Sequence, residues 1–343
     1  LPKGIVHSQQ GRRDWAYDVS LALRYNDQAK TLITIGLYSN ISWVAMLSTL
    51  LVGGTLQLHK RFDAKAFLQT VEDEAITHTA MVPIQYQRVV EVMRSERESH
   101  YDVSSMQSMM SCGSPLHTEL KADIFSRFSC GIIELYGLTE GIITTLSPEQ
   151  AEGRLSSVGR PLLGTDIAIV DERGRLQPAG KSGEIVSRGR ITMAGYFNRQ
   201  QATLEAQYID DQGRCWLRSG DIGLFDEEGF LYIVDRKKDM ILSGGQNVYP
   251  QDIEAVMSAH EAVNDVAVIA AKSARWGETP IALVVREEAT LSLEDDIRCW
   301  ANQKLGKQQR LAEVIFLKDL PRNANGKVLK RELSKQYGAR HYE

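Results

Sequence analysis

The chain has 343 residues, of which 43% are hydrophobic and 24% charged, and its formal net charge is -4. This length is sufficient for about two domains, each with a core of its own. The slight acidity argues against the broad positive field with which proteins attract nucleic acids or anionic membranes. We therefore expect a small-molecule substrate and neither a nucleic-acid partner nor a membrane.

The four cysteines are far apart in the sequence, and no two of them form a Cys-x-x-Cys pair typical of zinc or redox sites. They are Cys112, Cys130, Cys215 and Cys299. Isolated cysteines of this kind are typical of reduced thiols, which predicts a cytoplasmic protein. The first residues, LPKGIVHSQQGRR, lack the apolar segment of a signal peptide.

A long uncharged stretch, residues 31–58, raises the question of a transmembrane helix. Asn40 and the pair Gly53-Gly54 interrupt it, and a strand-like alternation follows them. We therefore predict no membrane span, but a strand, a helix and a second strand. These elements are Leu32–Leu37, Ser42–Val52 and Thr55–Leu58.

Strands and helices continue to alternate beyond this unit. Asp63 has the character of a helix N-cap, and Pro83 suits the first turn of another helix. The predicted elements are helices after Asp63, from Pro83 and at Leu116–Phe128, and strands at Thr77–Val82, Met106–Met110 and Ile132–Leu135. Such alternation predicts an α/β fold with helices on both faces of a parallel sheet.

From Ser157 to Val234 the pattern changes to short strands with many glycines, which predicts a β-rich subdomain. The next stretch, LYIVDRKKDMILSGGQNVYP at Leu231–Pro250, has the pattern of a strand, a pivot and a loop. A second, small α/β unit is predicted after it. Its elements are helices at Gln251–Ala259 and Leu293–Leu305, and strands at Asp265–Ala270, Ile281–Val285 and Glu313–Leu317. We infer two domains, 1–237 and 238–343, joined by a hinge.

One short stretch with chemical potential is Tyr136-Gly137-Leu138-Thr139-Glu140, which directly follows a buried strand. Ligands of α/β proteins meet the sheet at the carboxyl ends of its strands. An aromatic ring can stack on a base, a hydroxyl can donate to a phosphate, and a carboxylate can bind magnesium. A simple turn with a capping threonine explains this stretch equally well when it is taken alone.

Three further stretches are equally ambiguous by themselves. Asp221, in WLRSGD, could accept hydrogen bonds from two ribose hydroxyls, but it could also be an ordinary turn residue. Arg236 could reach a sugar or a phosphate, although clusters of charges are more often solvated. Lys327 stands alone in the turn PRNANGK, where an ordinary surface lysine is the simplest explanation.

The order and spacing of five motifs closely resemble those of the adenylate-forming enzymes, the superfamily of acyl-CoA and aryl-CoA synthetases, luciferases and peptide-synthetase adenylation domains. The motifs are YGLTE, GEIVSRG with AGYF, RSGD, DRKKDMILSGGQNVYP and PRNANGK. The resemblance covers essentially the whole chain. It implies that ATP activates a carboxylic acid to an acyl-adenylate, with release of pyrophosphate, and that the acyl group then passes to a thiol.

The resemblance also implies the architecture and the nucleotide contacts. The fold would be the distal part of a large α/β domain, with a parallel-rich sheet and a β-rich subdomain, followed by a small mobile α+β domain. Tyr136 would stack on adenine, Thr139 would contact the α-phosphate and Glu140 the Mg²⁺ ion, while Asp221 would hold the ribose with help from Arg236. Further residues expected to contact the nucleotide are Lys3, Gly113, Ser114, Pro115, Glu134, Leu135 and Gly137.

The small domain would supply the remaining groups. Lys327 would bridge the substrate carboxylate and the phosphate, and would stabilise the charge that develops as the carboxylate attacks phosphorus. Lys327, Thr139 and Glu140 are thus the expected catalytic residues. Gly244 and Gly245 would approach CoA, and Lys238 would be the hinge residue.

The chain departs from the family pattern at two places. The phosphate-binding loop of the family is a run of Ser, Thr and Gly that ends in Pro-Lys-Gly, and Leu1-Pro2-Lys3-Gly4 matches only its end. We therefore expect a chain without the N-terminal part of the large domain, whose missing segment, as a separate fragment, is a candidate partner. Ser39 stands where many relatives have a histidine or an aromatic residue. The expected acyl pocket is formed by Tyr38, Ser39, Trp43, Cys112 and Ile142.

The segment GGQNVYPQDIE looks like the corresponding segment of the CoA ligases, whereas peptide-synthetase domains usually carry an Arg-Ile-Glu type of sequence there. No cation is evident near Ile142, Ile143 or Trp43, so an apolar acyl or aryl acid is expected. We predict a carboxylic acid:CoA ligase that uses ATP, Mg²⁺ and CoA. An acyl-carrier-protein ligase, a peptide-synthetase-type enzyme and a non-catalytic nucleotide-binding fragment remain alternatives, and the oligomeric state is left open.

Overall fold

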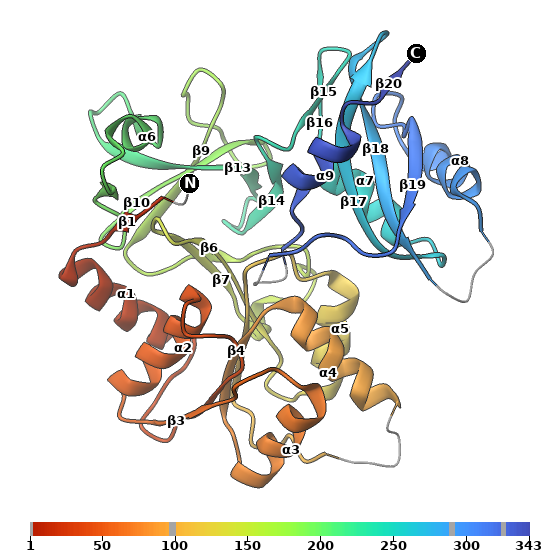
Figure 1. Cartoon of the computed structure of the whole chain (residues 1–343). Coiled ribbons are helices and arrows are strands. Elements are labelled where there is room, and N and C mark those ends of the chain that lie inside the picture. Colours follow the sequence, from red (N-terminus) through yellow and green to blue (C-terminus); the bar gives the residue numbers. More distant parts are fainter. Residues whose placement is uncertain (1–2, 96–100, 288–291, 324–326) are drawn as a thin grey trace. The chain divides into compact units, whose positions relative to one another are not determined.

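The computed structural model describes residues 3–95, 101–287, 292–323 and 327–343 (Figure 1). The chain forms two compact units, which are described separately below. The first unit comprises Leu1–Ser219 and Gly223–Ile233, and the second comprises Gly220–Ile222 and Val234–Glu343. The predicted pivot at Lys238 concerns a rotation, so it stays a prediction.

The first unit is built on a seven-stranded sheet with the strand order β3-β2-β4-β5-β6-β7-β8. The strands are β2 (Lys30–Ile33), β3 (Thr55–Leu58), β4 (His78–Met81), β5 (Ser108–Ser111), β6 (Ile133–Leu138), β7 (Ile142–Leu146) and β8 (Arg160–Pro161). The pairs from β3 through β6 are parallel, whereas β7 and β8 add antiparallel neighbours. This confirms the predicted parallel-rich sheet.

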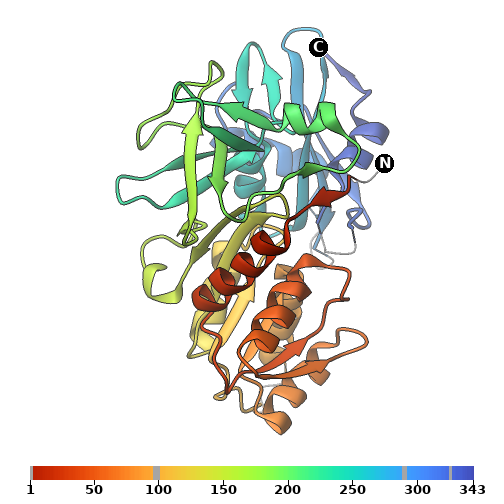
Figure 2. The same ribbon diagram turned by 90° about the vertical axis from the view of Figure 1, so that its left-hand side faces the viewer.

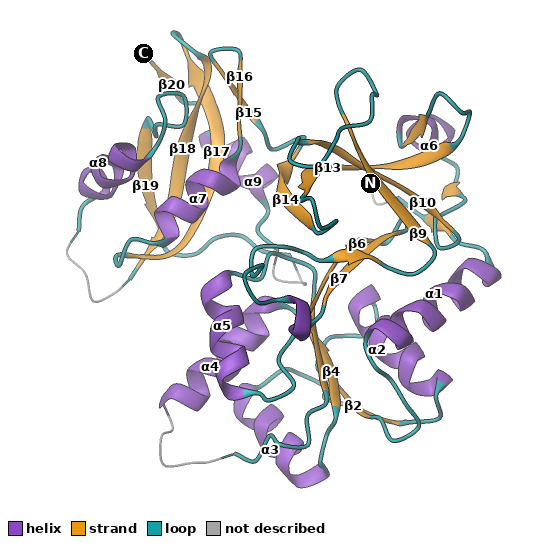
Figure 3. Cartoon of the chain, turned by 180° about the vertical axis from the view of Figure 1, so that it is seen from behind, coloured by secondary structure: helices purple, strands orange, loops and turns teal. Residues whose placement is uncertain are grey.

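Helices cover both faces of this sheet, as predicted. Helices α1 (Gln9–Ala22) and α2 (Asn40–Leu51) lie side by side on one face (Figure 2). Helices α3 (Ala64–Glu74), α4 (Pro83–Ser95) and α5 (Thr118–Arg127) lie on the other (Figure 3). Successive side chains of a strand point to opposite faces. Ala80 therefore packs in the core under α1 and α2, whereas its neighbour Met81 packs in the core under α3 to α5.

Local sequence signals placed several of these elements correctly. The carboxylate of Asp63 caps α3 by accepting a hydrogen bond from the Ala66 amide at 2.9 Å, and Pro83 opens α4. The uncharged stretch 31–58 forms β2, α2 and β3. No helix in the described part of the chain combines the length and the apolar character needed to cross a bilayer.

Helix α1 was not predicted, although a capping residue marks its start. The Ser8 hydroxyl accepts a hydrogen bond from the Gly11 amide at 2.9 Å. Buried positions of α1 include Trp15 and Val19, but also Asp18, which breaks the apolar pattern that sequence reasoning relies on. Asp18 is accommodated because it pairs with Arg190, which is 172 residues away in the sequence.

The antiparallel turn after β6 also differs from the prediction. A loop was expected after Leu135, but β6 continues to Leu138 and pairs with β7. Tyr136 and Gly137 are therefore strand residues. At Gly137 an added Cβ atom would lie 2.5 Å from the Ile142 carbonyl oxygen, so a glycine permits this close pairing.

The predicted β-rich subdomain is confirmed. It contains a five-stranded sheet of order β12-β13-β10-β9, in which β14 also pairs with β13. The strands are β9 (Thr165–Val170), β10 (Gly183–Gly189), β12 (Gln207–Ile209), β13 (Cys215–Phe225) and β14 (Leu231–Arg236). A separate ribbon joins β1 (Ile5–Val6) to β11 (Gly195–Tyr196), and the short helices η1 (Pro148–Gln150) and α6 (Gln200–Glu205) complete the unit.

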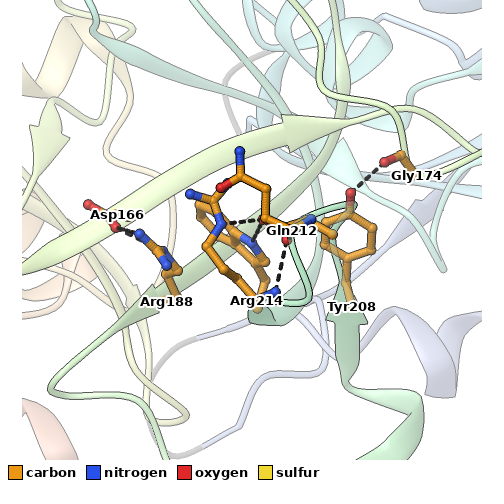
Figure 4. Close-up of polar contacts among 8 residues, drawn as sticks. Asp166, Gly174, Arg188, Tyr208, Gln212 and Arg214 are labelled. Carbon is orange, nitrogen blue, oxygen red and sulfur yellow. Dashed lines mark hydrogen bonds and ion pairs between the residues drawn. The ribbon is translucent and has the colours of Figure 1, made fainter.

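Polar contacts tie the strands and turns of this subdomain together (Figure 4). Arg188 on β10 forms an ion pair with Asp166 on β9, with nitrogen and oxygen 2.8 Å apart. The Tyr208 hydroxyl donates a hydrogen bond to the Gly174 carbonyl at 2.5 Å. Side-chain contacts therefore connect strands and turns of the subdomain in addition to its backbone ladder.

The second unit is a small α/β domain, as predicted. Its six-stranded sheet has the order β16-β15-β18-β17-β20, and β19 also pairs with β18. The strands are β15 (Ile241–Ser243), β16 (Gln246–Val248), β17 (Val263–Ser273), β18 (Gly277–Arg286), β19 (Glu313–Leu317) and β20 (His341–Tyr342). Helices α7 (Pro250–Ser258) and α8 (Glu294–Lys304) pack on one face, and α9 (Lys330–Tyr337) packs on the other. Helix α9 and strand β20 were not predicted.

A glycine in the first unit provides a test of its packing. Gly159 has a φ of +88°, and a Cβ atom there would lie 1.9 Å from the Thr145 carbonyl oxygen. We predict that Gly159→Ala lowers the free energy of unfolding by more than about 3 kcal/mol. The alanine would adopt a strained left-handed conformation, and the backbone would also have to shift to relieve the clash of its Cβ atom with the Thr145 carbonyl. Urea unfolding of the native protein measures this.

Gly153 is the matched control. Its φ is +70°, but a Cβ atom there would meet nothing within 4 Å. Gly153→Ala should therefore cost only the ~1–2 kcal/mol of a left-handed conformation. Equal losses for the two variants would mean that the close approach at Gly159 contributes nothing.

Candidate functional site

The turn between β6 and β7 presents two of the predicted catalytic side chains. Leu138 pairs with Ile142, and the Gly141 amide donates a hydrogen bond to the Leu138 carbonyl at 3.0 Å. Thr139, Glu140 and Gly141 thus form a three-residue hairpin loop, and Gly141 has a φ of +124°, which favours glycine. Thr139 is exposed and Glu140 is half-buried at the end of the sheet.

Contacts from the β1–β11 ribbon hold this turn. The Tyr196 hydroxyl donates a hydrogen bond to Glu140 Oε1 at 2.9 Å, and a ring nitrogen of His7 lies 2.8 Å from the Thr139 carbonyl oxygen. Burial and the bond to Glu140 raise the pKa of Tyr196, whereas burial lowers the pKa of His7. The Lys3 ammonium lies 4.3 Å from the centre of the Tyr196 ring. The predicted residues Lys3, Thr139 and Glu140 therefore belong to one cluster.

Tyr196 and His7 were missed by the sequence analysis as parts of this cluster. Tyr196 lies in AGYF, a stretch that contributed to the family resemblance without a role for its tyrosine. His7 directly follows β1, and only the ribbon pairing brings it near a turn 132 residues later. Leu1 and Pro2, the first residues of the expected phosphate-loop match, lie outside the described residues.

The predicted adenine contacts come from neighbouring strands. Tyr136 lies on β6, and Gly113, Ser114 and Pro115 follow β5, its parallel neighbour. The Tyr136 ring packs against an apolar cluster formed by Val158, Ile169, Ile185 and Leu231. Gly113 has a φ of +95°, and a Cβ atom there would lie 3.2 Å from Ile41 Cδ1. The tyrosine and the small-residue segment thus belong to adjacent carboxyl ends of the sheet.

The side chains of two residues predicted to contact the nucleotide, Glu134 and Leu135, lie in the core. The Glu134 side chain is buried and forms an ion pair with Lys121, which also donates to the Leu155 carbonyl. Burial raises the pKa of Glu134, and Lys121 opposes that shift. The Leu135 side chain packs in the core under α1 and α2. Neither side chain is available to a nucleotide, so only their main chains can have that role.

The second unit brings together the predicted ribose residues. Asp221 is buried, and its Oδ1 lies 3.1 Å from Nε of Arg236. The Lys237 amide donates a hydrogen bond to the Gly220 carbonyl at 3.0 Å, and Gly220 has a φ of +71°. This geometry holds a buried carboxylate next to a guanidinium.

Lys327 belongs to the same charged group in the second unit. Its amide donates to Oδ1 of Asn323 at 2.9 Å, and its carbonyl accepts from the Asn323 amide at 2.9 Å. Burial lowers the pKa of Lys327 to about 8, with a further lowering by Arg236 and an opposing effect of Asp221. Residues 324–326, which belong to the same predicted motif, lie outside the described residues.

The predicted CoA loop is the turn of the β15–β16 hairpin. Gly244 and Gly245 have φ values of +59° and +77°, and the Gly244 amide donates to the Trp276 carbonyl at 2.8 Å. Arg275 and Lys307 lie 4.7 and 5.5 Å from the Trp276 ring centre. The glycine loop is thus next to an aromatic ring with two cations. Sequence analysis missed this cluster, for which only the pair Arg275-Trp276 is a local signal.

The other proposed residues stay predictions. Lys238 is exposed in the turn after β14, as a pivot residue requires. Of the expected acyl-pocket residues, Tyr38 and Trp43 are 74% and 40% exposed near the start of α2, so both can meet a ligand. Ile142 and Cys112 are buried, and burial raises the pKa of the Cys112 thiol to about 12, which makes it a packing residue.

Two details of the acyl-pocket prediction change. The Ser39 hydroxyl caps α2 by accepting from the Ile41 amide at 3.3 Å, so it is engaged in helix structure. The expectation that no cation lies near Trp43 is wrong. The guanidinium carbon of Arg12 lies 5.9 Å from the Trp43 ring centre. The cation was overlooked because it belongs to α1, which the sequence pattern did not predict.

Comparison with known families decides the family of this chain. The model of the AMP-binding enzyme family matches residues 1–197, and that of the AMP-binding enzyme C-terminal domain matches residues 252–327. The chain belongs to the AMP-binding enzyme family. The resemblance to adenylate-forming enzymes that the motifs indicated is thereby confirmed.

Individual relatives agree with this assignment. The chain is 34% identical to feruloyl-CoA synthase of Amycolatopsis, and the match covers 85% of this chain and 58% of that protein. It is 33% identical to the long-chain-fatty-acid–CoA ligase FadD13 of Mycobacterium tuberculosis over 98% and 65% of the two chains. The structure of o-succinylbenzoate CoA synthetase (MenE) from Bacillus subtilis with the acyl-adenylate OSB-AMP matches with a TM-score of 0.86 and 29% identity, over 99% of this chain and 67% of that one. The chain thus spans between 58% and 67% of the length of these relatives.

The depressed pKa of Lys327 can be tested directly. We predict that the lysine titrates near pH 8, so its positive charge is present below that pH and is lost as the pH rises through it. Arg236→Gln should raise this pKa, because Arg236 disfavours the charged amine, and Asp221→Asn should lower it further. NMR titration of ¹³C-methylated lysines measures the pKa, and Lys327→Arg identifies the signal. A value near the ordinary 10.5 that neither substitution changes would contradict the electrostatic coupling.

Proposed function

We propose that the protein joins a carboxylic acid to CoA in two steps, through an acyl-adenylate formed from ATP. The observation that carries this proposal is the charged group of Asp221, Arg236 and Lys327 in a chain of the AMP-binding enzyme family. A half-buried lysine beside an ion pair is suited to an anionic reaction centre. The names of the relatives, which are CoA synthases and ligases, support the same reaction class.

In the first step, a carboxylate oxygen of the acid attacks the α-phosphorus of ATP. A bond forms between this oxygen and the α-phosphorus. The bond between the α-phosphorus and the oxygen that bridges to the β-phosphate breaks, and pyrophosphate leaves. Lys327 would contact both the carboxylate and the phosphate, and thereby stabilise the charge in the transition state. The exposed Thr139 hydroxyl would donate to the α-phosphate.

Magnesium belongs to this proposal as the partner of the phosphates. Mg²⁺ in such sites is held by one or two carboxylates together with substrate phosphates. Glu140 is a suitable single ligand, because Tyr196 orients its carboxylate through Oε1. Among the residues that the structure describes, no group of three or more His, Cys, Asp or Glu side chains forms a ready metal site, which agrees with an ion bound chiefly through ATP. The ion would neutralise the charge of the phosphates.

The remaining nucleotide contacts follow the chemistry of each side chain. Asp221 would accept hydrogen bonds from the ribose hydroxyls, and its ion pair with Arg236 would orient this carboxylate. Tyr136 would provide a flat apolar face for adenine, and Gly113 would leave room for the base.

In the second step, the CoA thiolate attacks the carbonyl carbon of the acyl-adenylate, and AMP leaves with the bonding electrons of the carbon-oxygen bond. Gly244 and Gly245 would approach the pantetheine. Trp276, with Arg275 and Lys307 beside it, would bind the nucleotide part of CoA by stacking and by contacts to its phosphates. We further propose that the C-terminal unit rotates about Lys238 between the two steps. A cytoplasmic location is part of the same proposal, because all four cysteines are free.

The first test separates adenylation from thioester formation. Lys327→Ala in the native protein should lower the rate of acid-dependent pyrophosphate exchange by roughly 10²- to 10³-fold, the effect of losing one preorganised electrostatic contact. Thioester formation from supplied acyl-adenylate and CoA should persist, because Lys327 acts on phosphorus only.

Lys335→Ala is the matched control, since Lys335 is an exposed lysine on α9 of the same unit. It should leave both steps unchanged. Equal loss of both steps in Lys327→Ala would refute the assigned role. If no acid supports exchange in the unmodified protein, a non-catalytic nucleotide-binding function would replace the ligase proposal.

The second test concerns the thiol acceptor. Trp276→Ala should raise the KM for CoA by roughly 5- to 100-fold, since base stacking on an aromatic ring contributes ~1–3 kcal/mol. Trp276→Phe should retain most of the affinity, and the KM for ATP in the exchange reaction should not change in either variant. Transfer to an acyl-carrier protein with no transfer to CoA would favour the carrier-protein ligase or the peptide-synthetase-type alternative.

A further inference from the structure

We propose that Arg12 binds a second anionic group of the substrate acid, so that the enzyme prefers acids with an additional carboxylate. This inference rests on the proposed function and names the substrate class of that reaction. It replaces the expectation of an apolar acid, which assumed that no cation lies near Trp43.

The Arg12 guanidinium lies among aromatic rings at the start of α1 and α2. Its carbon atom is 4.3 Å from the Trp15 ring centre and 5.9 Å from that of Trp43. Nη2 donates a hydrogen bond to Oδ1 of Asn40 at 2.9 Å. The aromatic rings contact the guanidinium through their faces, and a guanidinium has five N–H donors in a planar fork. One bond to Asn40 therefore leaves donors for a ligand.

Within the described ranges 3–95, 101–287, 292–323 and 327–343, no carboxylate forms an ion pair with Arg12. The acidic residues of its own helix are engaged elsewhere. Asp14 pairs with Arg13 at 3.0 Å, and Asp18 pairs with Arg190. Arg12 is half-buried, and this burial lowers its pKa, which is the effect of removing a cation from water. A half-buried cation without a protein carboxylate is suited to an anion that a ligand supplies.

The position of Arg12 favours the substrate acid as the source of that anion. Asn40 and Trp43 belong to the segment that the family resemblance assigns to the acyl pocket. On the other side, His7 experiences the charge of Arg12 and contacts the Thr139 carbonyl, next to the proposed α-phosphate contact. Arg12 thus lies next to the expected acyl segment and close enough to His7 to lower its pKa. The half-exposed Trp43 ring is also suited to contact the hydrocarbon part of an acid.

The test compares matched acids by pyrophosphate exchange in the native protein. Each pair has one carbon skeleton, with and without a second carboxylate: hexanoate with adipate, and 4-methylcinnamate with 4-carboxycinnamate. We expect kcat/KM to favour the diacids. Arg12→Leu should reduce kcat/KM for the diacids by roughly 10- to 100-fold, the effect of losing a charged hydrogen bond, and change that for the monoacids by less than about twofold.

Two further variants make the result specific. Arg12→Lys should retain part of the preference, because the charge stays while the bidentate geometry is lost. Arg13→Leu removes a neighbouring exposed arginine that already pairs with Asp14, and should leave the preference unchanged. Melting temperatures of all variants are measured alongside.

The outcomes separate this inference from the proposed function. A changed KM for ATP or pyrophosphate in Arg12→Leu, with unchanged selectivity between acids, would assign Arg12 to the phosphates and overturn the inference. Equal loss for diacids and monoacids would make Arg12 a structural residue. Exchange with acids of both kinds and no preference for diacids would overturn the inference alone. No exchange with any acid would refute the proposed function, and the inference with it.

Discussion

The β6–β7 hairpin is the constraint on which the catalytic turn depends. A strand of a parallel sheet usually leads into a helix, but here the chain reverses and pairs with itself. Gly137 permits the Ile142 carbonyl to approach, and Gly141 adopts a conformation that favours glycine. With both conditions met, Thr139 and Glu140 project from a short turn at the end of the sheet. A site on such a turn holds its groups more accurately than a long loop would.

Electrostatics organises the second unit in a comparable way. Asp221 and Arg236 come from two paired strands, and their ion pair is mostly removed from water. Lys327 experiences both charges, and the cation has the larger effect on its pKa. A lysine in this environment is less strongly hydrated than a surface lysine, so a substrate anion displaces less water from it. The same features that disfavour its charge in the free protein thus favour a tight contact with a phosphate.

The parts of the fold that could be predicted from the sequence are those marked by local sequence signals. Asp63 and Pro83 marked helix starts, because capping and the fixed φ of proline act within a few residues. Helix α1 was missed because Asp18 occupies a buried position and is neutralised by a residue that is remote in sequence. Helix α9 was missed because it is short and polar, with Leu333 as its buried residue.

The functional residues also divide into those that local motifs predicted and those that the fold brings together. The motifs located Thr139, Glu140, Asp221 and Lys327, since each lies in a short recognisable stretch. Tyr196 and His7, in contrast, reach the Thr139–Glu140 turn through the pairing of distant strands, and Arg12 reaches Trp43 through the packing of two helices. No local sequence pattern encodes such contacts. A motif can therefore identify the reaction class, but it does not identify the residues that select a substrate.

The buried pair of Lys121 and Glu134 restricts how this protein can change over time. Removing either partner leaves an uncompensated charge in the interior, which typically costs about 3–5 kcal/mol, whereas an apolar pair of similar volume is often neutral or stabilising. Single substitutions at these two positions therefore pass through an unstable intermediate. We expect the two positions to vary jointly among homologues, as charged pairs or as apolar pairs. Glu134 lies two residues before Tyr136, so such a paired exchange would alter the support of the proposed adenine contact without touching the motif itself.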